Sequence, residues 1–444
     1  MSTPRLALAA AALFAAFAPG GGAGAEPWGD APLSGDPQAI LAAARALPPP
    51  KGAPVDVLLE EGSFVFDARG AVTFTYRLVY RPLSREAARS WARIERTWAP
   101  WHQARPEVRA RVITPSGGVH LLDPRTLVEA GVGDEGEEMY SDRRVLQGPL
   151  PAVVTDAVVE EVSVVRDESP FFEAGTLSRF WLSQPNPVRR VRLRIDAPKG
   201  LPIQWLVRGT DVRPVESERD GRRVLVFERR DAPARGEIEP YPPRDAEIAA
   251  NVAFTTGRSW EEVARRYAEI LEGRLRGSDL SGVAARVVPP GTPRPAAVRL
   301  LAGWLAQNVR YTGLEFGEGA IVPAPPDETL GRRYGDCKDL SLLLVGLLRA
   351  AGIDAHVALL RTEWFEVSPE LPGLGEFDHA IVRVDGKDPI WIDPTDPFSP
   401  PGQLPPPDAG RLALVARAGT RALVPTPAAR SIDSRTTTVR EIWL

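Results

Sequence analysis

The sequence is poor in cysteine, because Cys337 is the only one among 444 residues. One cysteine cannot pair within the chain, so no internal disulfide is expected. In an oxidising compartment paired cysteines tend to become disulfides. A lone thiol is therefore either a buried spectator or a group retained for its reactivity. The residues around Cys337 must decide between these two interpretations.

The sequence also lacks a strong excess of one charge. Its 54 basic and 58 acidic residues leave a formal net charge of -4, and no strongly basic stretch stands out. This balance gives no electrostatic footprint of a nucleic-acid-binding protein. The hydrophobic share of 43% and the charged share of 25% are instead typical of a soluble globular protein.

A cluster of metal-binding residues is also missing from residues 55–250. The sequence has only four histidines, and His102 and His120 have no second His, Cys or carboxylate pair at ligand spacing. The acidic segment 133–138 lacks the alternating ligand spacing of a calcium loop, and it is predicted to be a solvated turn. We therefore expect no metal and no cofactor.

Long hydrophobic runs are limited to the N-terminus. Arg5 precedes an apolar stretch at residues 6–17, and small residues follow at 23–25. This pattern is typical of a secretory signal peptide, predicted to occupy residues 1–25 with cleavage after Ala25. The alternative is an uncleaved anchor, but the run is shorter than the about 20 residues that span a bilayer. We expect a periplasmic or secreted mature protein with no integral membrane segment.

Proline and glycine are abundant, with 45 and 39 residues, and they punctuate the chain with loops. A short helix is predicted at residues 37–47, within a lead-in at residues 26–54. In residues 55–250, apolar and polar residues alternate in several stretches, as at 72–80 and 191–195. This is the period of half-buried strands. Six or more such strands predict a β-sandwich-like domain.

The period becomes helical near Ser259, which begins a capping-box signature. A second helix is predicted at residues 296–309. Strands return at residues 411–417 and 436–444, so residues 401–444 are predicted to begin a C-terminal β region. The apolar end of the chain has no partner strand after it, which favours the hypothesis that the chain is truncated.

The block around Cys337 carries the strongest chemical signal. A Leu-rich helix is predicted over residues 340–348, with Gly335 allowing a sharp entry and Asp336 as the N-cap. Cys337 then occupies the first turn, where unpaired N–H groups and the helix dipole stabilise a thiolate. The same N–H groups can hold a tetrahedral oxyanion. A nucleophile needs this position, whereas a spectator gains nothing from it.

A base and an orienting acid are predicted on a downstream β-hairpin. His379 begins one strand, a turn follows at residues 385–387, and the second strand ends at Asp393. The hairpin brings its two ends together, so Asp393 can fix the tautomer of His379. Each residue alone has an ordinary structural explanation, but together they predict a triad of nucleophile Cys337, base His379 and orienting Asp393. His356 is a rival base, ranked lower because no acidic partner lies at comparable spacing.

Residues 311–393 resemble the transglutaminase-like superfamily, whose fold is papain-like. The resemblance implies a core of helices with an antiparallel sheet at residues 255–400, with the same triad as its site. Residues 55–250 resemble the domain of unknown function that often precedes this core in bacterial proteins. The expected fold class is therefore α+β. The motifs that carry the resemblance are Tyr334-Gly335-Asp336-Cys337-Lys338-Asp339, Ala351-Gly352-Ile353-Asp354-Ala355, Asp378-His379-Ala380 and Trp391-Ile392-Asp393-Pro394-Thr395.

Two functions stay open. The first is an exported cysteine hydrolase or acyltransferase that acts on amide or peptide bonds of a protein or peptide substrate in the cell envelope. Hydrolysis is favoured over transamidation because water is abundant and no amine site is evident. The second is a non-catalytic module that binds a cell-envelope partner and uses the core as a scaffold. Trp304, Asn308 and Tyr311 lie near the place expected for a second oxyanion donor, although Trp304 and Tyr311 are more typical of core residues.

Overall fold

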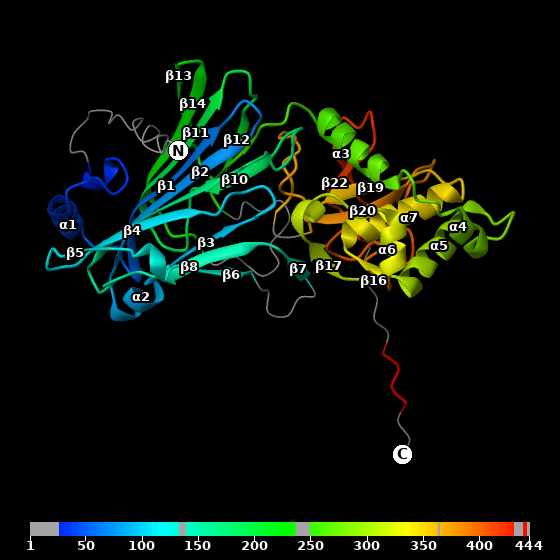
Figure 1. The fold of residues 1–444 in the computed structure, drawn as a ribbon, viewed down its shortest axis with the longest axis horizontal. Coiled ribbons are helices and arrows are strands. Elements are labelled where there is room, and N and C mark those ends of the chain that lie inside the picture. The colour runs from blue at the N-terminus through cyan, green and yellow to red at the C-terminus, as the bar shows by residue number, and fades with distance from the viewer. Residues whose placement is uncertain (1–25, 133–138, 237–248, 363–364, 430–437, 442–444) are drawn as a thin grey trace, which may run out of the picture.

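The computed structural model describes residues 26–132, 139–236, 249–362, 365–429 and 438–441. The predicted signal peptide and the acidic segment 133–138 lie outside these residues. A β-rich N-terminal part lies next to a C-terminal part of helices around a smaller sheet (Figure 1). The predicted α+β fold class is confirmed, whereas the domain boundaries stay predictions. Within the described residues, no helix is both long and apolar enough to span a bilayer.

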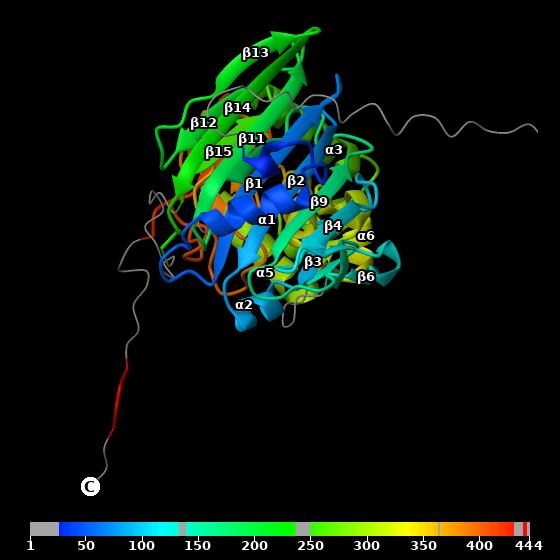
Figure 2. The same cartoon turned by 90° about the vertical axis from the view of Figure 1, so that its left-hand side faces the viewer.

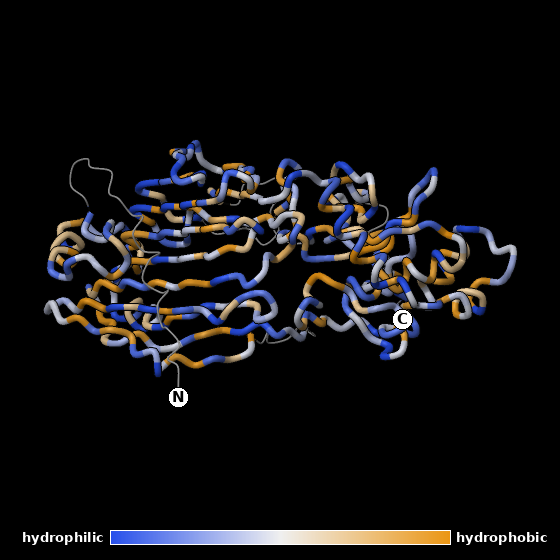
Figure 3. Tube along the Cα trace, turned by 45° about the horizontal axis from the view of Figure 1, so that its top comes forward, coloured by the Kyte–Doolittle hydropathy of each residue, from blue (hydrophilic) through white to orange (hydrophobic). Residues whose placement is uncertain are grey.

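Eight strands form the largest sheet, in the spatial order β13-β14-β11-β1-β2-β9-β4-β5. Neighbouring strands are antiparallel except β1 and β11, which are parallel. In β11 the buried residues Val191, Leu193 and Ile195 alternate with partly exposed arginines, as the sequence predicts. The colour of the strands in Figure 3 alternates in the same way. The bounds are β1 (Val55–Phe66), β2 (Val72–Pro82), β4 (Glu107–Ile113), β5 (Val119–Leu121), β9 (Val158–Arg166), β11 (Val188–Pro198), β13 (Val215–Arg219) and β14 (Arg222–Ala232).

Two three-stranded sheets form the second layer of the sandwich. Apolar side chains of both layers make one continuous core. The ring of Phe64 on β1 packs edge-on against Phe254, with centroids 4.9 Å apart. Gly62 leaves room for Phe180, which a Cβ at position 62 would meet at 2.4 Å. One sheet contains β3 (Arg93–Trp98), β8 (Arg144–Pro149) and β6 (Val128–Gly131), and the other contains β10 (Leu177–Trp181), β15 (Asn251–Thr255) and β12 (Gln204–Arg208).

Helix α1 (Pro37–Ala46) covers the outer face of the large sheet (Figure 2). The side chain of Asp36 caps it by accepting the N–H of Ala39 at 2.8 Å. Ile40 and Leu41 are buried against apolar residues of four sheet strands. The helix predicted at residues 37–47 is thus confirmed. The remaining short elements of this part are α2 (Arg85–Ser90) and two 3-10 turns, Pro27–Gly29 and Pro124–Thr126.

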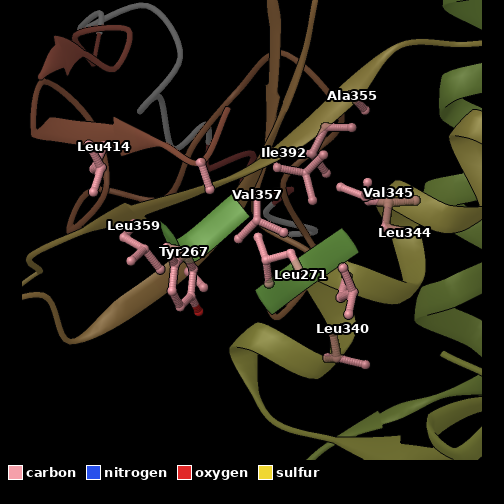
Figure 4. Close-up of a cluster of buried hydrophobic side chains, with 14 of the residues drawn as sticks. Tyr267, Leu271, Leu340, Leu344, Val345, Ala355, Val357, Leu359, Ile392 and Leu414 are labelled. Carbon is pink, nitrogen blue, oxygen red and sulfur yellow. The ribbon is translucent and has the colours of Figure 1, made fainter. Parts of the chain in front are cut away.

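Helix α7 (Cys337–Ala350) is the centre of the C-terminal part. Its buried leucines recur at helical spacing and pack against β19 and β20. Figure 4 shows Leu340 and Leu344 of this helix in the same core as Val357 of β19. The sheet is antiparallel in the order β21-β20-β19-β22-β23. The bounds are α3 (Trp260–Leu275), α4 (Ser281–Val287), α5 (Arg294–Asn308), α6 (Pro326–Arg332), β19 (Ala355–Leu360), β20 (His379–Val384), β21 (Ile390–Ile392), β22 (Leu412–Val415) and β23 (Val424–Pro425), with a 3-10 turn at Gly317–Ala320.

Two short parallel strand pairs complete the fold. β16 (Arg310–Tyr311) pairs with β18 (Tyr334–Gly335), and β7 (Met139–Ser141) of the N-terminal part pairs with β17 (Gly313–Glu315). The strand predicted at residues 411–417 corresponds to β22. Residues 438–441 form no strand, and the rest of the strand predicted at 436–444 lies outside the described residues.

A seam of main-chain contacts joins the two parts through residues 365–378, which precede β20. The N–H of Leu177 on β10 donates to the carbonyl of Leu374 at 2.6 Å. At Gly257, between β15 and α3, an added Cβ would lie 2.1 Å from the carbonyl oxygen of Pro372. The segment that leads into His379 is therefore held by the β-rich part.

Candidate active site

Cys337 is the first residue of α7, and it is half-buried. Asp336 caps the helix, because its Oδ1 accepts the N–H groups of Lys338 and Asp339, each at 3.1 Å. Asp339 completes a capping box by accepting the N–H of Asp336 at 3.3 Å. This cap leaves the N–H of Cys337 itself unused. The sulfur thus lies at the positive end of the helix dipole, which favours a thiolate.

Lys338 places a further positive charge beside the thiol. Its side chain is buried and forms an ion pair with Asp336. Burial lowers the pKa of Lys338, but the negative charges of Asp336 and Cys337 outweigh burial and raise that pKa. The ammonium group therefore stays charged. Sequence reasoning missed this residue, since an isolated lysine is ordinarily expected in solvent.

His379 is the first residue of β20, where it pairs with Leu360 of β19. Its Nε2 lies 3.3 Å from Oδ2 of Asp393, and its side chain is hydrogen-bonded to Cys337. Burial alone would lower the pKa of His379. The hydrogen bonds to Asp393 and Cys337, and the negative charges of both groups, raise it well above its ordinary value. The His379 imidazole therefore keeps its proton to a higher pH than a free histidine does.

Asp393 follows β21 and is 5% exposed. Its Oδ1 accepts the N–H of Thr395 at 2.8 Å and the Thr395 hydroxyl at 2.7 Å, which fixes the carboxylate toward His379. Burial opposes its charge, but hydrogen bonds from His379 and Thr395, with the positive charge of His379, lower the pKa of Asp393. The structure thus brings the three residues predicted from the sequence, Cys337, His379 and Asp393, into one group.

Asp408 is a second carboxyl group at the same histidine. Its Oδ2 lies 3.8 Å from Nε2 of His379, and the residue is 2% exposed. Burial is the main cause that raises the pKa of Asp408 to about 7. Sequence reasoning missed Asp408 because it lies in a proline-rich loop with no periodic pattern. The one available signal was an acidic residue immediately after three prolines.

Tyr311 borders the site from β16. It is 39% exposed, so the prediction that it is a core residue is wrong. Burial of part of its ring, followed by negative charge at Cys337, Asp336 and Asp393, raises the pKa of its phenol. The phenol therefore remains a hydrogen-bond donor at neutral pH. Trp304 does pack against the core.

The other residue considered as a donor, Asn308, is engaged by its own helix. Its side-chain amide donates to the carbonyl of Trp304 at 2.8 Å. The amide also lies at the exposed C-terminal end of α5. Of the three residues considered, Tyr311 is thus the one whose phenol responds to the charge of Cys337.

His356 lies on β19, away from this group. It occupies position 356 of the strand, whereas His379 pairs at position 360. Its Nε2 lies 3.4 Å from Asp354 and 3.6 Å from Asp385. His356 thus has two acidic neighbours, Asp354 directly before its own strand and Asp385 after β20, although neither lies at the spacing that separates His379 from Asp393. Burial lowers the pKa of His356, which favours the neutral ring.

Comparisons with protein families agree with this architecture. Residues 68–235 match DUF3857, a domain of unknown function with a solved structure. Residues 281–384 match the transglutaminase-like superfamily. Cys337 and His379 lie within the second match, whereas Asp393 and Asp408 follow it. No curated protein matches the chain.

The chain is similar to two solved structures. A candidate protease from Parabacteroides distasonis is 16% identical, with a TM-score of 0.67 over 85% of this chain and 72% of its own. A candidate cysteine protease from Cytophaga hutchinsonii is 15% identical over 57% of this chain and 76% of its own, with a TM-score of 0.25. The likeness to the Parabacteroides distasonis protein shows the fold. The chain thus carries a match to the transglutaminase-like superfamily over residues 281–384, preceded by a match to DUF3857 over residues 68–235.

Proposed function

We propose that the protein is a cysteine hydrolase of amide or peptide bonds in which Cys337 is the nucleophile, His379 the general acid and base, and Asp393 the residue that orients His379. One observation carries the proposal: a thiol at a helix N-terminus is hydrogen-bonded to a histidine whose other side faces a buried carboxylate. This is the arrangement that an activated thiol nucleophile requires.

The chemistry follows from these positions. The Cys337 thiolate attacks the carbonyl carbon of the substrate, and the carbonyl oxygen takes the negative charge. His379 gives its proton to the departing nitrogen as the C–N bond breaks, leaving a thioester on Cys337. Neutral His379 then takes a proton from water as the water oxygen attacks the thioester. The carboxylic acid product leaves, and the thiolate–imidazolium pair is restored.

Two donors are available for the oxyanion in this proposal. The N–H of Cys337 is not used by the helix cap. The Tyr311 phenol stays protonated beside the sulfur. Donors that point at the developing charge contribute most when they are already in place before the reaction. We assign the N–H of Cys337 as the first donor and the Tyr311 hydroxyl as the second.

The test is the rate of Cys337 alkylation by iodoacetamide from about pH 4 to about pH 10, with 8.5 as the ordinary thiol pKa. We expect a reactive plateau that begins well below that value in the wild type and is lost in His379→Ala. His356→Ala is the matched control, because it removes a buried histidine with acidic partners outside the site. An ordinary thiol titration in all three proteins would contradict the proposal.

A second experiment addresses the bond that is cleaved. The protein is incubated with mixed peptides, quenched in acid and analysed by intact mass for a thioester on Cys337. Free amine release without amine incorporation supports hydrolysis over transamidation. Cys337→Ala must lose both signals, since the thioester forms on the sulfur.

We also propose export through residues 1–25, supported by the charged, apolar and small-residue order of that segment. N-terminal sequencing of the protein recovered from a bacterial envelope fraction should begin at Glu26. Recovery of an intact N-terminus in the cytoplasm would refute this part of the proposal.

A further inference from the structure

Asp408 is a buried acid that the proposed chemistry does not use. It faces the same ring nitrogen of His379 as Asp393 does, at 3.8 Å against 3.3 Å. Three side chains from separate segments, the start of β20, the end of β21 and the loop before β22, therefore meet at one point.

We propose that Asp408 is a positioning residue of this site, a second carboxyl group that hydrogen-bonds to Asp393 and, once ionised, holds the proton on His379. The inference rests on the proposed roles of Cys337 and His379. It adds a fourth member that acts through the histidine and touches no substrate.

The backbone around Asp408 is fixed without help from its side chain. Its N–H donates to the carbonyl of Pro405 at 3.0 Å, and its own carbonyl accepts the hydroxyl of Thr426. The side chain instead points into the site. Its Oδ2 is buried and receives no hydrogen bond from any donor in the described part of the chain.

Two neighbouring buried carboxylates resist being charged together, so below about pH 7 one of them carries a proton. Asp393 is the ionised one, because Thr395 and His379 donate to it. Asp408 Oδ2 has no such donor among the described residues, and the Asp408 carboxyl group lies within 4.8 Å of the Asp393 carboxylate. It is therefore the carboxylic acid of the pair, and its proton lies between the two groups.

The groups that face Asp408 decide when this proton leaves. Burial raises the pKa of Asp408 to about 7, opposed by the positive charge of His379 and reinforced by Asp393 and by Asp378 at the start of β20. Of the other charged groups of the site, Cys337 acts on His379, and Lys338 is paired with Asp336. The change of charge thus falls near neutral pH.

Ionisation of Asp408 adds a second negative charge beside the imidazolium. An opposite charge within about 4–6 Å raises the pKa of a histidine by about 1–3 units. The imidazolium of the wild type therefore keeps its proton to a higher pH than it would with Asp393 alone. At acidic pH Asp408 is neutral, so it does not change the protonation of His379 there.

The test is the titration of His379 by NMR in the full chain labelled at histidine, with its signal assigned from His379→Ala. Asp408→Asn keeps the shape and a donor toward Asp393 but cannot ionise. We expect the pKa of His379 to fall by about 1 unit or more in this variant. Asp354→Asn is the control, since that carboxylate faces His356 and should move only the His356 signal.

Unchanged His102 and His356 signals show in the same spectra that the variant is folded. An infrared difference spectrum between wild type and Asp408→Asn removes the bands of other buried acids such as Glu60 and Asp336, whose pKa values are also raised. The difference should show the carbonyl stretch of one neutral carboxylic acid at about pH 5, and this band should be lost by about pH 9. A His379 titration that does not respond to Asp408→Asn would overturn the inference.

The two proposals fail in different ways. If alkylation of Cys337 does not depend on His379, the proposed function fails whatever Asp408 does. If alkylation depends on His379 but the pKa of His379 is the same in Asp408→Asn and the wild type, only the positioning role of Asp408 is lost.

Discussion

Arg179 of β10 and Glu376, three residues before His379, form a buried ion pair that crosses between the two parts of the chain. The Arg179 Nε lies 2.7 Å from Glu376 Oε1, and the side chains are 8% and 6% exposed. Arg179 also donates to Asn251 of β15 at 2.7 Å. The carbonyl of Glu376 accepts Arg361 at 2.8 Å. The β-rich part thus helps to hold the segment that places the candidate base.

Replacing Arg179 with methionine should lower both stability and reactivity. Removal of one partner leaves Glu376 buried and unpaired, which typically costs about 3–5 kcal/mol. The segment before His379 then loses an anchor, so alkylation of Cys337 should become slower at neutral pH. Thermal melts and alkylation rates measure the two effects.

Arg230→Met is the matched control, because Arg230 forms exposed ion pairs with Glu26 and Glu228 that should contribute less than about 1 kcal/mol. An Arg179→Met protein that melts earlier but keeps the wild-type alkylation profile would limit the ion pair to a role in folding.

Gly257→Ala should destabilise the protein by about 1–3 kcal/mol, the usual effect of overpacking. The new Cβ would meet the carbonyl oxygen of Pro372 at 2.1 Å, and a backbone atom cannot turn aside as a side chain can. Chemical denaturation measures the change. Gly200→Ala is the control, since nothing lies within 4 Å of its Cβ, and it should be neutral or slightly stabilising. Equal effects of both substitutions would argue against a tight seam.

Asp408→Asn should stabilise the protein at neutral and alkaline pH. The pKa of Asp408 is raised from 3.8 to about 7, so the folded state binds a proton that the unfolded state releases between these values. Wild-type stability therefore falls as the pH rises from about 4 to about 7 and then levels off. The variant does not lose stability in this way. Its free energy of unfolding should therefore exceed that of the wild type by about 2–4 kcal/mol above pH 7. Denaturation at several pH values measures this difference in the free energy of unfolding. A difference that stays constant with pH would contradict the prediction.

Tyr311→Phe should slow amide hydrolysis by about 10- to 100-fold, because it removes one donor to the oxyanion. Alkylation by iodoacetamide should be unchanged, since that displacement forms no oxyanion. The control is Tyr334→Phe, at the neighbouring exposed tyrosine of β18, whose ring lies under Arg332. A parallel fall in alkylation and hydrolysis would instead indicate that Tyr311 merely supports the position of Cys337.

Local patterns allowed the central elements to be predicted. The leucine period and the Asp336 cap predict α7, and a short turn between two strands predicts that Asp393 returns to His379. Both relations connect residues close in sequence. Local sequence therefore suffices to put the nucleophile at a helix N-terminus and to pair the base with its orienting acid.

The remaining members depend on contacts between distant segments. Asp408 reaches His379 only because β22 adds to the free side of β19, and no periodicity encodes that addition. Asp385 reaches His356 from the end of the neighbouring strand β20, and Glu376 pairs with Arg179 across 197 positions of chain. Such pairings follow from how sheets pack, which one sequence does not specify at the level of single residues.

The seam at Gly175, Gly257 and Gly375 has a consequence for inheritance. At each position an added Cβ would lie within 2.5 Å of main-chain atoms of another segment, so the fit depends on the two backbones themselves. A different domain placed upstream of this core by recombination would need a backbone that leaves the same space at these three contacts. We therefore expect the two parts to pass between genomes as one unit, with side-chain drift confined to positions away from the join.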